Sequence, residues 1–332
     1  MAGADLIVLE RNSFGDTLGQ MNYWKMRGKS ILMVFDDAYH LMHSENPAYE
    51  FWHDGIVEVL TKQTVKDPET GEEKEVENKV KLNVTPKPLD MLTWGIQMSK
   101  GVQTPNKILA SDWEWANRTL YIPNYIEAHK YVDVKPLIPN EGHLVIGWGG
   151  SLSHMHSFEK SGVLRALKRI VRKHKNVRLL FTGDKRVYDL VDVPEKIKVF
   201  HPYVSDEEFP ALMKSFDIAL APLWGEFDKR RSRIKVLEYM ALKSPWIASD
   251  YPPYEDFKNY GVFADNTYDG WERVLDDMVK HYSDYADKAA GEPFEYAMTQ
   301  SFDANIEKTL KIYEDVCLNW TYPGYYFPYP NR

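Results

Sequence analysis

Short apolar runs alternate with amphipathic stretches along most of the chain. In the first third, "DLIVLER" (5–11) and "SILMVFDD" (30–37) are typical of β-strands, and the stretch between them (16–29) has a helical pattern that ends on Gly28. The same alternation predicts a helix near 88–100 and strands near 107–110 and at 120–124. Strands separated by covering helices favour a parallel sheet.

Residues 56–84 break this pattern. Two polar runs of strand type surround a turn that contains Pro68 and Gly71. We expect a projecting β-hairpin inserted in the first domain.

A Pro-rich stretch without periodicity, 132–142, is the expected interdomain linker, and a second α/β series follows it. Its predicted elements are strands at 143–148, 177–183, 196–200, 217–223 and 245–249, a helix over about 157–174, a helix from near Ser232 and a last helix at 302–320. The fold class is therefore α/β, with two Rossmann-like doubly wound domains that face each other across a cleft. The expected units are 1–139 with the hairpin at about 56–84, 140–301, and a C-terminal helix and aromatic tail, 302–332, that packs back on the first domain.

Composition and charge narrow the class of protein. With 332 residues, 44% hydrophobic and 27% charged, the chain can bury two cores. The net charge of −8 argues against a general polyanion-binding protein but leaves room for a local basic cleft. Cys317 is the single cysteine, which excludes an internal disulfide and favours a reducing compartment. The N-terminus lacks the pattern of a signal peptide and no apolar run approaches the roughly 20 residues of a membrane span, so we expect a cytoplasmic protein.

The stretch "RSRIKVLEYMALKSPWIAS" (231–249) places Arg231, Arg233 and Lys235 at the start of a predicted helix. Cations are disfavoured there, because the N-terminal end of a helix carries a positive partial charge. A surface ion pair between Lys235 and Glu238, worth ~0.3–0.5 kcal/mol, does not account for the whole cluster. A bound diphosphate would, and a carboxylate one turn further on can bind sugar hydroxyls.

Two other turns follow predicted strands of the second domain, and we expect them at the same edge of its sheet as the start of the helix at 231–249. Gly149, Gly150 and Ser151 follow the strand at 143–148, and their spacing is not the dinucleotide-binding fingerprint. Lys185 follows the strand in "FTGDKR". Either turn can approach a phosphate, although an ordinary βα turn and a solvated surface cation are the simpler interpretations.

The motif at 231–249, with "DIALAPLW" before it, "GHLVIGWGGSLSHMHSF" and "LYIPNYIEAHKY", resembles the GT-B glycosyltransferases of the retaining family-four kind. The resemblance implies donor-binding roles for residues matched one by one. Glu238 would hold the ribose, Lys235 and Arg233 the diphosphate, Tyr203 and Val204 the nucleotide base, and the turn at 149–151 the phosphates or the sugar. Arg230 departs from the family, which often has a glutamate there, and Lys243–Ser244 replaces a usual glycine.

Candidate catalytic residues lie near both domains. Asp37 follows a buried strand and can orient or deprotonate an acceptor hydroxyl, with a helix N-cap as the alternative. His154 can contact the sugar or phosphate, or be an ordinary loop histidine. His40 and His43 are three apart with no evident third ligand, so no metal is expected, and the resemblance also implies a metal-independent enzyme without other cofactors.

The expected function is transfer of a sugar from a nucleoside diphosphate sugar to an acceptor hydroxyl. The acceptor is a glycan, a small molecule or a hydroxymethylated base in phage DNA, for which the basic stretch 165–178 would be suited. Two alternatives stay open: a nucleotide-sugar epimerase of the same fold, and a non-catalytic nucleotide-sugar-binding protein. The oligomeric state has no signal in the sequence.

Overall fold

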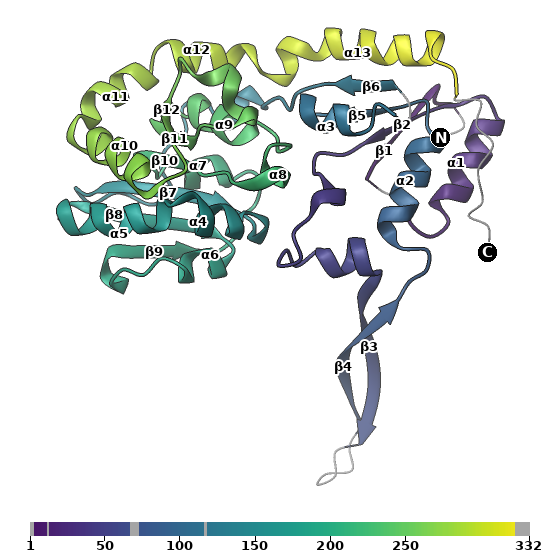
Figure 1. The fold of residues 1–332 in the computed structure, drawn as a ribbon, viewed down its shortest axis with the longest axis horizontal. Helices are drawn as coiled ribbons and strands as arrows, with labels where there is room; N and C mark the ends of the chain where they lie inside the picture. Colours follow the sequence, from purple (N-terminus) through teal and green to yellow (C-terminus); the bar gives the residue numbers. More distant parts are fainter. Residues whose placement is uncertain (1–2, 12, 67–72, 116–117, 323–332) are drawn as a thin grey trace.

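Two parallel sheets lie side by side in the computed structural model, which describes residues 3–11, 13–66, 73–115 and 118–322 (Figure 1). The first sheet has the strand order β1-β2-β5-β6, and every pair in it is parallel. Its strands are β1 (Leu6–Glu10), β2 (Ser30–Val34), β5 (Gly101–Thr104) and β6 (Arg118–Tyr121). Its helices are α1 (Thr17–Met26), α2 (Pro88–Met98) and α3 (Lys107–Asp112). We call this part the first domain.

The second sheet is larger and has the order β12-β11-β10-β7-β8-β9, again with parallel neighbours. Its strands are β7 (Leu144–Gly150), β8 (Val177–Gly183), β9 (Lys198–His201), β10 (Ile218–Ala221), β11 (Trp246–Ser249) and β12 (Val262–Ala264). The chain adds β8 and β9 on one side of β7 and then crosses to add β10 on the other. The strand order therefore reverses between β7 and β10. We call this part the second domain.

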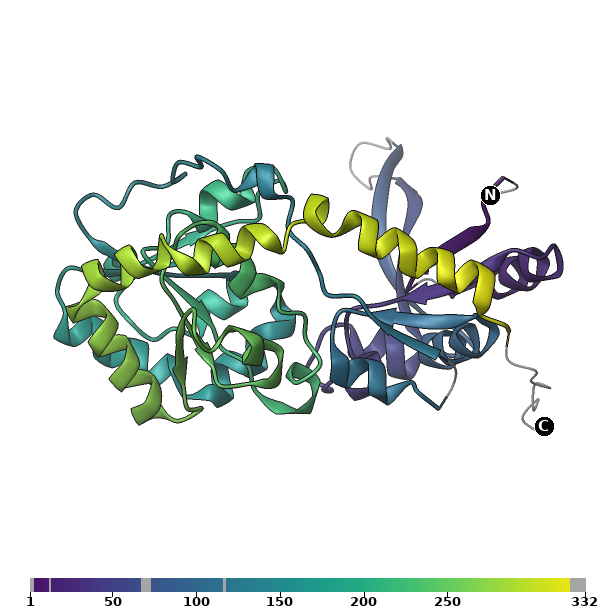
Figure 2. The same ribbon diagram turned by 90° about the horizontal axis from the view of Figure 1, so that it is seen from above.

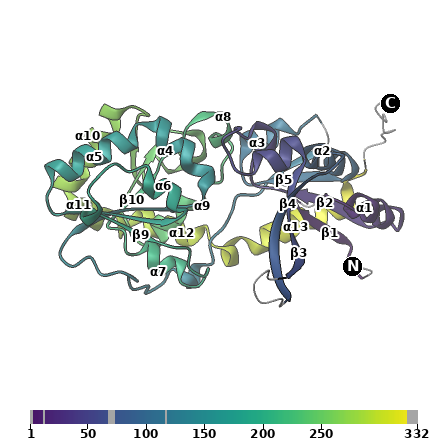
Figure 3. The same ribbon diagram turned by 90° about the horizontal axis from the view of Figure 1, so that it is seen from below.

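Helices cover both faces of the second sheet (Figure 3). One face packs on α4 (Met155–Ser161), α5 (Val163–Lys173), α6 (Lys185–Asp189) and α10 (Tyr268–Lys280). The other packs on α7 (Phe209–Met213), α9 (Ile234–Ala241) and α12 (Glu292–Thr299). The remaining helices are α8 (Gly225–Asp228) and α11 (Tyr282–Ala289), and the short helical turns are η1 (Tyr39–Leu41), η2 (Glu50–Asp54), η3 (Ala128–Lys130), η4 (Leu152–His154), η5 (Glu195–Ile197) and η6 (Pro252–Phe257).

The predicted fold class of two Rossmann-like α/β domains is confirmed, with two local corrections. The strand expected near 107–110 is wrong, because that stretch is α3 and the strand is β5 just before it. The Asn106 side chain accepts hydrogen bonds from the backbone N–H groups of Ile108 and Leu109 and so starts the helix. The single helix expected over 157–174 is two helices, since Gly162 adopts a left-handed conformation (φ 91°) between them.

The hairpin and the last helix extend away from the two sheets. Strands β3 (Ile56–Lys66) and β4 (Glu73–Asn83) pair antiparallel and project from the first domain (Figure 1), while the turn predicted at Pro68 and Gly71 lies outside the described residues. Helix α13 (Phe302–Asn319) runs from the second domain back across the first sheet (Figure 2). The Tyr313 hydroxyl donates to Gln103 Oε1 at 2.9 Å. Among the described residues, no helix has the length and apolar character needed to cross a bilayer.

The packing at Gly147 gives a stability prediction. A Cβ atom at this position in β7 would lie 1.9 Å from the Phe216 ring, so Gly147→Ala should lower the free energy of unfolding by about 1–3 kcal/mol. A Cβ at Gly19 in α1 meets nothing within 4 Å, so the control Gly19→Ala should be neutral or stabilising. Urea unfolding measures both, and equal midpoints for the two variants would contradict the packing described.

Candidate active site

The carboxyl end of β7 lies beside the reversal of strand order, which is where open α/β sheets bind ligands. β7 ends in Gly149 and Gly150, and both glycines are required by close neighbours. A Cβ at Gly149 would be 2.8 Å from Thr182 Cγ2, and one at Gly150 would be 2.7 Å from the Trp148 ring and 3.1 Å from Lys235 Nζ. Gly150 thus lets a lysine from another element reach the end of the strand, and Gly149 lets β8 pack close beside it.

Lys235 comes from the first turn of α9. Its ammonium group donates a hydrogen bond to the Gly149 carbonyl and lies 5.0 Å from the centre of the Trp148 ring. Burial lowers the pKa of Lys235, while the Glu238 carboxylate opposes that shift. A buried positive charge therefore faces the glycine turn.

Glu238 lies one turn further along α9. Its Oε1 accepts a hydrogen bond of 2.9 Å from the Tyr131 hydroxyl, and burial raises the pKa of its carboxyl. Lys235 and Glu238 thus each have a partner from another part of the chain. They are not joined simply as a surface ion pair, which was the alternative left by the sequence.

Arg231 completes the charged cluster, together with an aspartate that the sequence analysis missed. Arg231 Nε donates to Asp228 Oδ1 at 2.9 Å, and its Nη2 donates to the Ser153 carbonyl at 2.8 Å. Asp228 is 3% exposed and also accepts hydrogen bonds from the Ser157 hydroxyl and the Trp224 backbone N–H. The signal in the sequence was the spacing of three between Asp228, the last residue of α8, and Arg231, which brings opposite charges together in the turn that follows the helix.

Arg233 does not join this cluster. Its Nη2 donates to Gln300 Oε1 at 2.5 Å, and its guanidinium lies over the Phe257 ring. Residues two apart in a helix point in nearly opposite directions, so Arg233 and Lys235 cannot share a ligand-binding face of α9. Arg233 lines another cleft with Asn106 and Tyr121, which Arg231 reaches from the cluster.

Asp37 lies in the first domain and lines the cavity between the domains, whereas His154 is buried in the second domain beside it. Asp37 Oδ1 is 3.5 Å from Arg231 Nη1, and burial raises the pKa of its carboxyl. Asp37, Ser151 and Ser153 line a cavity of about 500 Å³ between the domains. His154 is 9% exposed, and burial together with Arg231 and Lys235 lowers its pKa well below the ordinary value.

The three other predicted donor residues lie after β8 and β9. The Tyr203 side chain is 63% exposed, and its hydroxyl lies 3.4 Å from the Gly150 carbonyl, to which it donates. Val204 beside it is partly buried. Lys185 is exposed and pairs with Asp189 at 2.6 Å, so it is separate from the cluster around Lys235.

Arg230, where the resembling family often has a glutamate, connects the domains. Its Nη2 donates to Asp112 Oδ1 of α3 at 3.0 Å, and its Nη1 lies 3.2 Å from Glu226 Oε2. The Asn106 amide adds a hydrogen bond of 2.9 Å to the Arg231 carbonyl. The segment before α9 is therefore bound to the first domain by its side chains and its backbone.

The two facing sheets define a protein of the GT-B fold, and comparison with known proteins agrees. Residues 144–278 match the family described as glycosyl transferases group 1. Sucrose-phosphate synthase from Thermosynechococcus elongatus is similar at 12% identity with a TM-score of 0.60, over 95% of this chain and 74% of that one. Anabaena HepE in complex with UDP and glucose is similar at 12% identity with a TM-score of 0.61, over 93% and 78%. No curated protein sequence matches the chain.

The buried pair of Asp228 and Arg231 gives a second prediction. Asp228→Ala leaves a buried guanidinium without its nearest carboxylate, which should cost about 3–5 kcal/mol in the free energy of unfolding. The exposed pair of Arg273 and Asp265, 3.7 Å apart, supplies the control, and Asp265→Ala should change stability by less than about 1 kcal/mol. Chemical unfolding of both variants tests this, and a neutral Asp228→Ala would show that Arg231 does not need its partner.

Proposed function

We propose that this protein transfers a sugar from a nucleoside diphosphate sugar to an acceptor hydroxyl. The observation that carries the proposal is the placement of Lys235 and Glu238 on adjoining turns of α9, beside the glycine turn where the strand order reverses. A cation for a diphosphate and a carboxylate for ribose hydroxyls are the two groups that a nucleotide sugar requires.

The donor would lie along the carboxyl edge of the second sheet. Its diphosphate would meet Lys235 and the turn at Gly150 and Ser151, and its ribose would meet Glu238. The exposed Tyr203 ring beside Gly150 offers a surface on which a base can stack. Because the structure of HepE holds UDP and glucose, a UDP-sugar is the first donor to test.

The chemistry would depend on charge stabilisation and on a group that handles the acceptor proton. Lys235 would stabilise the negative charge that develops on the leaving diphosphate. Asp37 faces the cavity from the opposite domain, and a carboxylate with a raised pKa is a better proton acceptor at neutral pH. Retention of configuration at the anomeric carbon is part of the proposal and rests on the family resemblance.

The cavity wall favours an uncharged acceptor. On the first-domain side it is formed by aromatic side chains, with Tyr39 and Trp52 stacked 4.0 Å apart, and by the carboxyl groups of Glu10 and Asp37, which outnumber the one guanidinium there, that of Arg11. Carboxylates repel the phosphates of DNA. Three of the seven lysines and arginines in the basic stretch 165–178 are paired with carboxylates, as Arg169–Glu272, Lys173–Asp276 and Lys168–Asp192. We therefore propose that the acceptor is a neutral glycan or small molecule rather than hydroxymethylated DNA.

Donor turnover separates this proposal from its rivals. UDP release from a panel of UDP-sugars should be slow alone and faster with an acceptor from a panel that includes hydroxymethylcytosine DNA, with mass spectrometry to identify the product. Conversion of the donor sugar without any acceptor would indicate an epimerase. Tight binding with no turnover under any condition would indicate a non-catalytic binding protein.

Donor affinity tests the two residues on α9. Lys235→Ala and Glu238→Ala should each weaken UDP-sugar binding at least tenfold, because each removes a charged contact to the ligand. Lys185→Ala is the matched control, since that exposed lysine already pairs with Asp189 and should leave the affinity unchanged. Isothermal titration calorimetry gives the dissociation constants. Wild-type affinity in both α9 variants would refute the assignment.

Turnover tests the role of Asp37. Asp37→Asn keeps the shape of the side chain but removes its basicity, so the transfer rate should fall about 10²–10⁴-fold while donor affinity stays near the wild-type value. The neighbouring Asp36 is exposed, and Asp36→Asn should retain full activity. If the transfer rate falls equally in both variants, or falls in neither, Asp37 has no part in the mechanism.

A further inference from the structure

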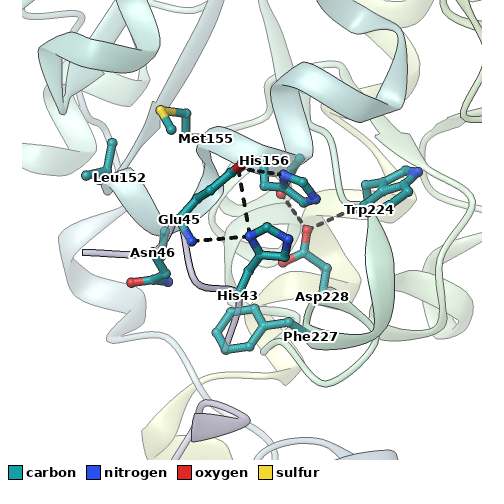
Figure 4. A pocket seen from close by; sticks show the side chains of 11 residues that line it. His43, Glu45, Asn46, Leu152, Met155, His156, Trp224, Phe227 and Asp228 are labelled. Atoms are coloured by element: carbon teal, nitrogen blue, oxygen red, sulfur yellow. Dashed lines mark hydrogen bonds and ion pairs between the residues drawn. The ribbon is translucent and has the colours of Figure 1, made fainter. Parts of the chain in front are cut away.

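A second cluster of potential ligands lies at the rim of the interdomain cleft, away from Lys235 and Glu238. His43 and Glu45 follow η1 in the first domain, and His156 lies in the first turn of α4 in the second domain. Figure 4 shows the three side chains pointing toward one another. One ligand atom from each lies within 4.8 Å of the other two.

The carboxylate of Glu45 lies between two imidazole nitrogens. Its Oε2 is 3.8 Å from His43 Nδ1 and 3.6 Å from His156 Nδ1, distances too long for hydrogen bonds. The two imidazole rings stack with centres 4.4 Å apart. Direct hydrogen bonding between the side chains therefore does not account for their convergence.

Both nitrogens are suited to accept a metal ion. His43 Nδ1 accepts only a long hydrogen bond of 3.3 Å from the Glu45 backbone N–H, so its single lone pair is weakly engaged and a metal ion would replace that contact. His156 Nδ1 is buried and has no hydrogen-bond partner among the residues that the structure describes. A buried polar atom without a partner is costly, and a ligand that it coordinates would remove that cost.

We propose that His43, Glu45 and His156 bind a divalent transition-metal ion of the zinc type, which links the two domains. Two imidazoles and a carboxylate suit such an ion, whose tetrahedral ligands lie about 3.4 Å apart at ordinary zinc–nitrogen distances. Small side-chain rotations would bring the three ligands to that separation. Glu159 Oε2, 3.9 Å from His156 Nδ1 and one turn further along α4, can supply the fourth ligand.

From the sequence no metal is expected, because His40 and His43 have no evident third ligand. The fold changes the set: His40 pairs with Asp112, and His156 comes from a different domain to join His43. The site also adjoins the charged cluster, because the Ser157 hydroxyl, next to His156, donates to Asp228. An ion here would hold the rim of the cleft closed near the cluster that carries Arg231.

Zinc titration of the full chain by calorimetry tests the proposal. The wild type should bind one zinc ion with a micromolar dissociation constant, and zinc should raise its melting temperature by a few degrees. His43→Ala and His156→Ala should each weaken binding at least tenfold and abolish the shift in melting temperature, and Glu45→Gln serves as a further variant if either folds poorly. His281→Ala is the matched control, because His281 has one carboxylate partner, Asp277 at 3.1 Å, as in a simple surface pair.

Several results would overturn the proposal. Unchanged affinity in both histidine variants would place the ion elsewhere, and loss in His43→Ala alone would confine it to the first domain. An equal loss in His281→Ala would indicate non-specific binding to surface histidines. Because these readouts do not involve sugar transfer, they are independent of whether the proposed activity is correct.

Discussion

The contact on which the second domain's site depends is the one between the Lys235 ammonium group and the end of β7. A lysine in the first turn of a helix is poorly placed by the helix dipole, and here it is also buried, so its pKa falls. The contact exists because Gly150 leaves space for it and the Gly149 carbonyl accepts a hydrogen bond from the ammonium group. The structure thus holds a desolvated positive charge at the end of β7, an arrangement whose cost a bound diphosphate would offset.

A second consequence concerns how the two domains face each other. Arg230 and Arg231 are consecutive residues, yet each pairs with a carboxylate of the first domain, Asp112 and Asp37 respectively. The segment before α9 therefore couples the second domain to the first across the cleft. At Arg230, where the chain departs from the resembling family, the side chain holds the domains together.

Much of this could be predicted from the sequence, because strands and helices of an α/β protein carry local periodic signals. β8 was predicted with its observed bounds, and α13 to within one residue. The errors came from single residues with local effects: the Asn106 cap that starts α3, and the left-handed Gly162 that divides α4 from α5. Neither effect has a periodic signature.

The site was harder to predict, because side-chain direction and tertiary partners decide it. Grouping Arg233 with Lys235 ignored the helical rotation between them, and only the fold shows that Arg233 contacts Gln300. Asp228 was missed because its importance comes from burial against Ser157 and Arg231. The approach of His156 to His43 and Glu45 joins residues more than a hundred positions apart.

The most direct test of the account is a crystal structure of the protein with UDP bound. In that structure the diphosphate should lie within hydrogen-bond distance of Lys235 Nζ, and the ribose hydroxyls should lie within hydrogen-bond distance of the Glu238 carboxylate. A nucleotide bound instead in the cleft of Arg233, Asn106 and Tyr121 would contradict it.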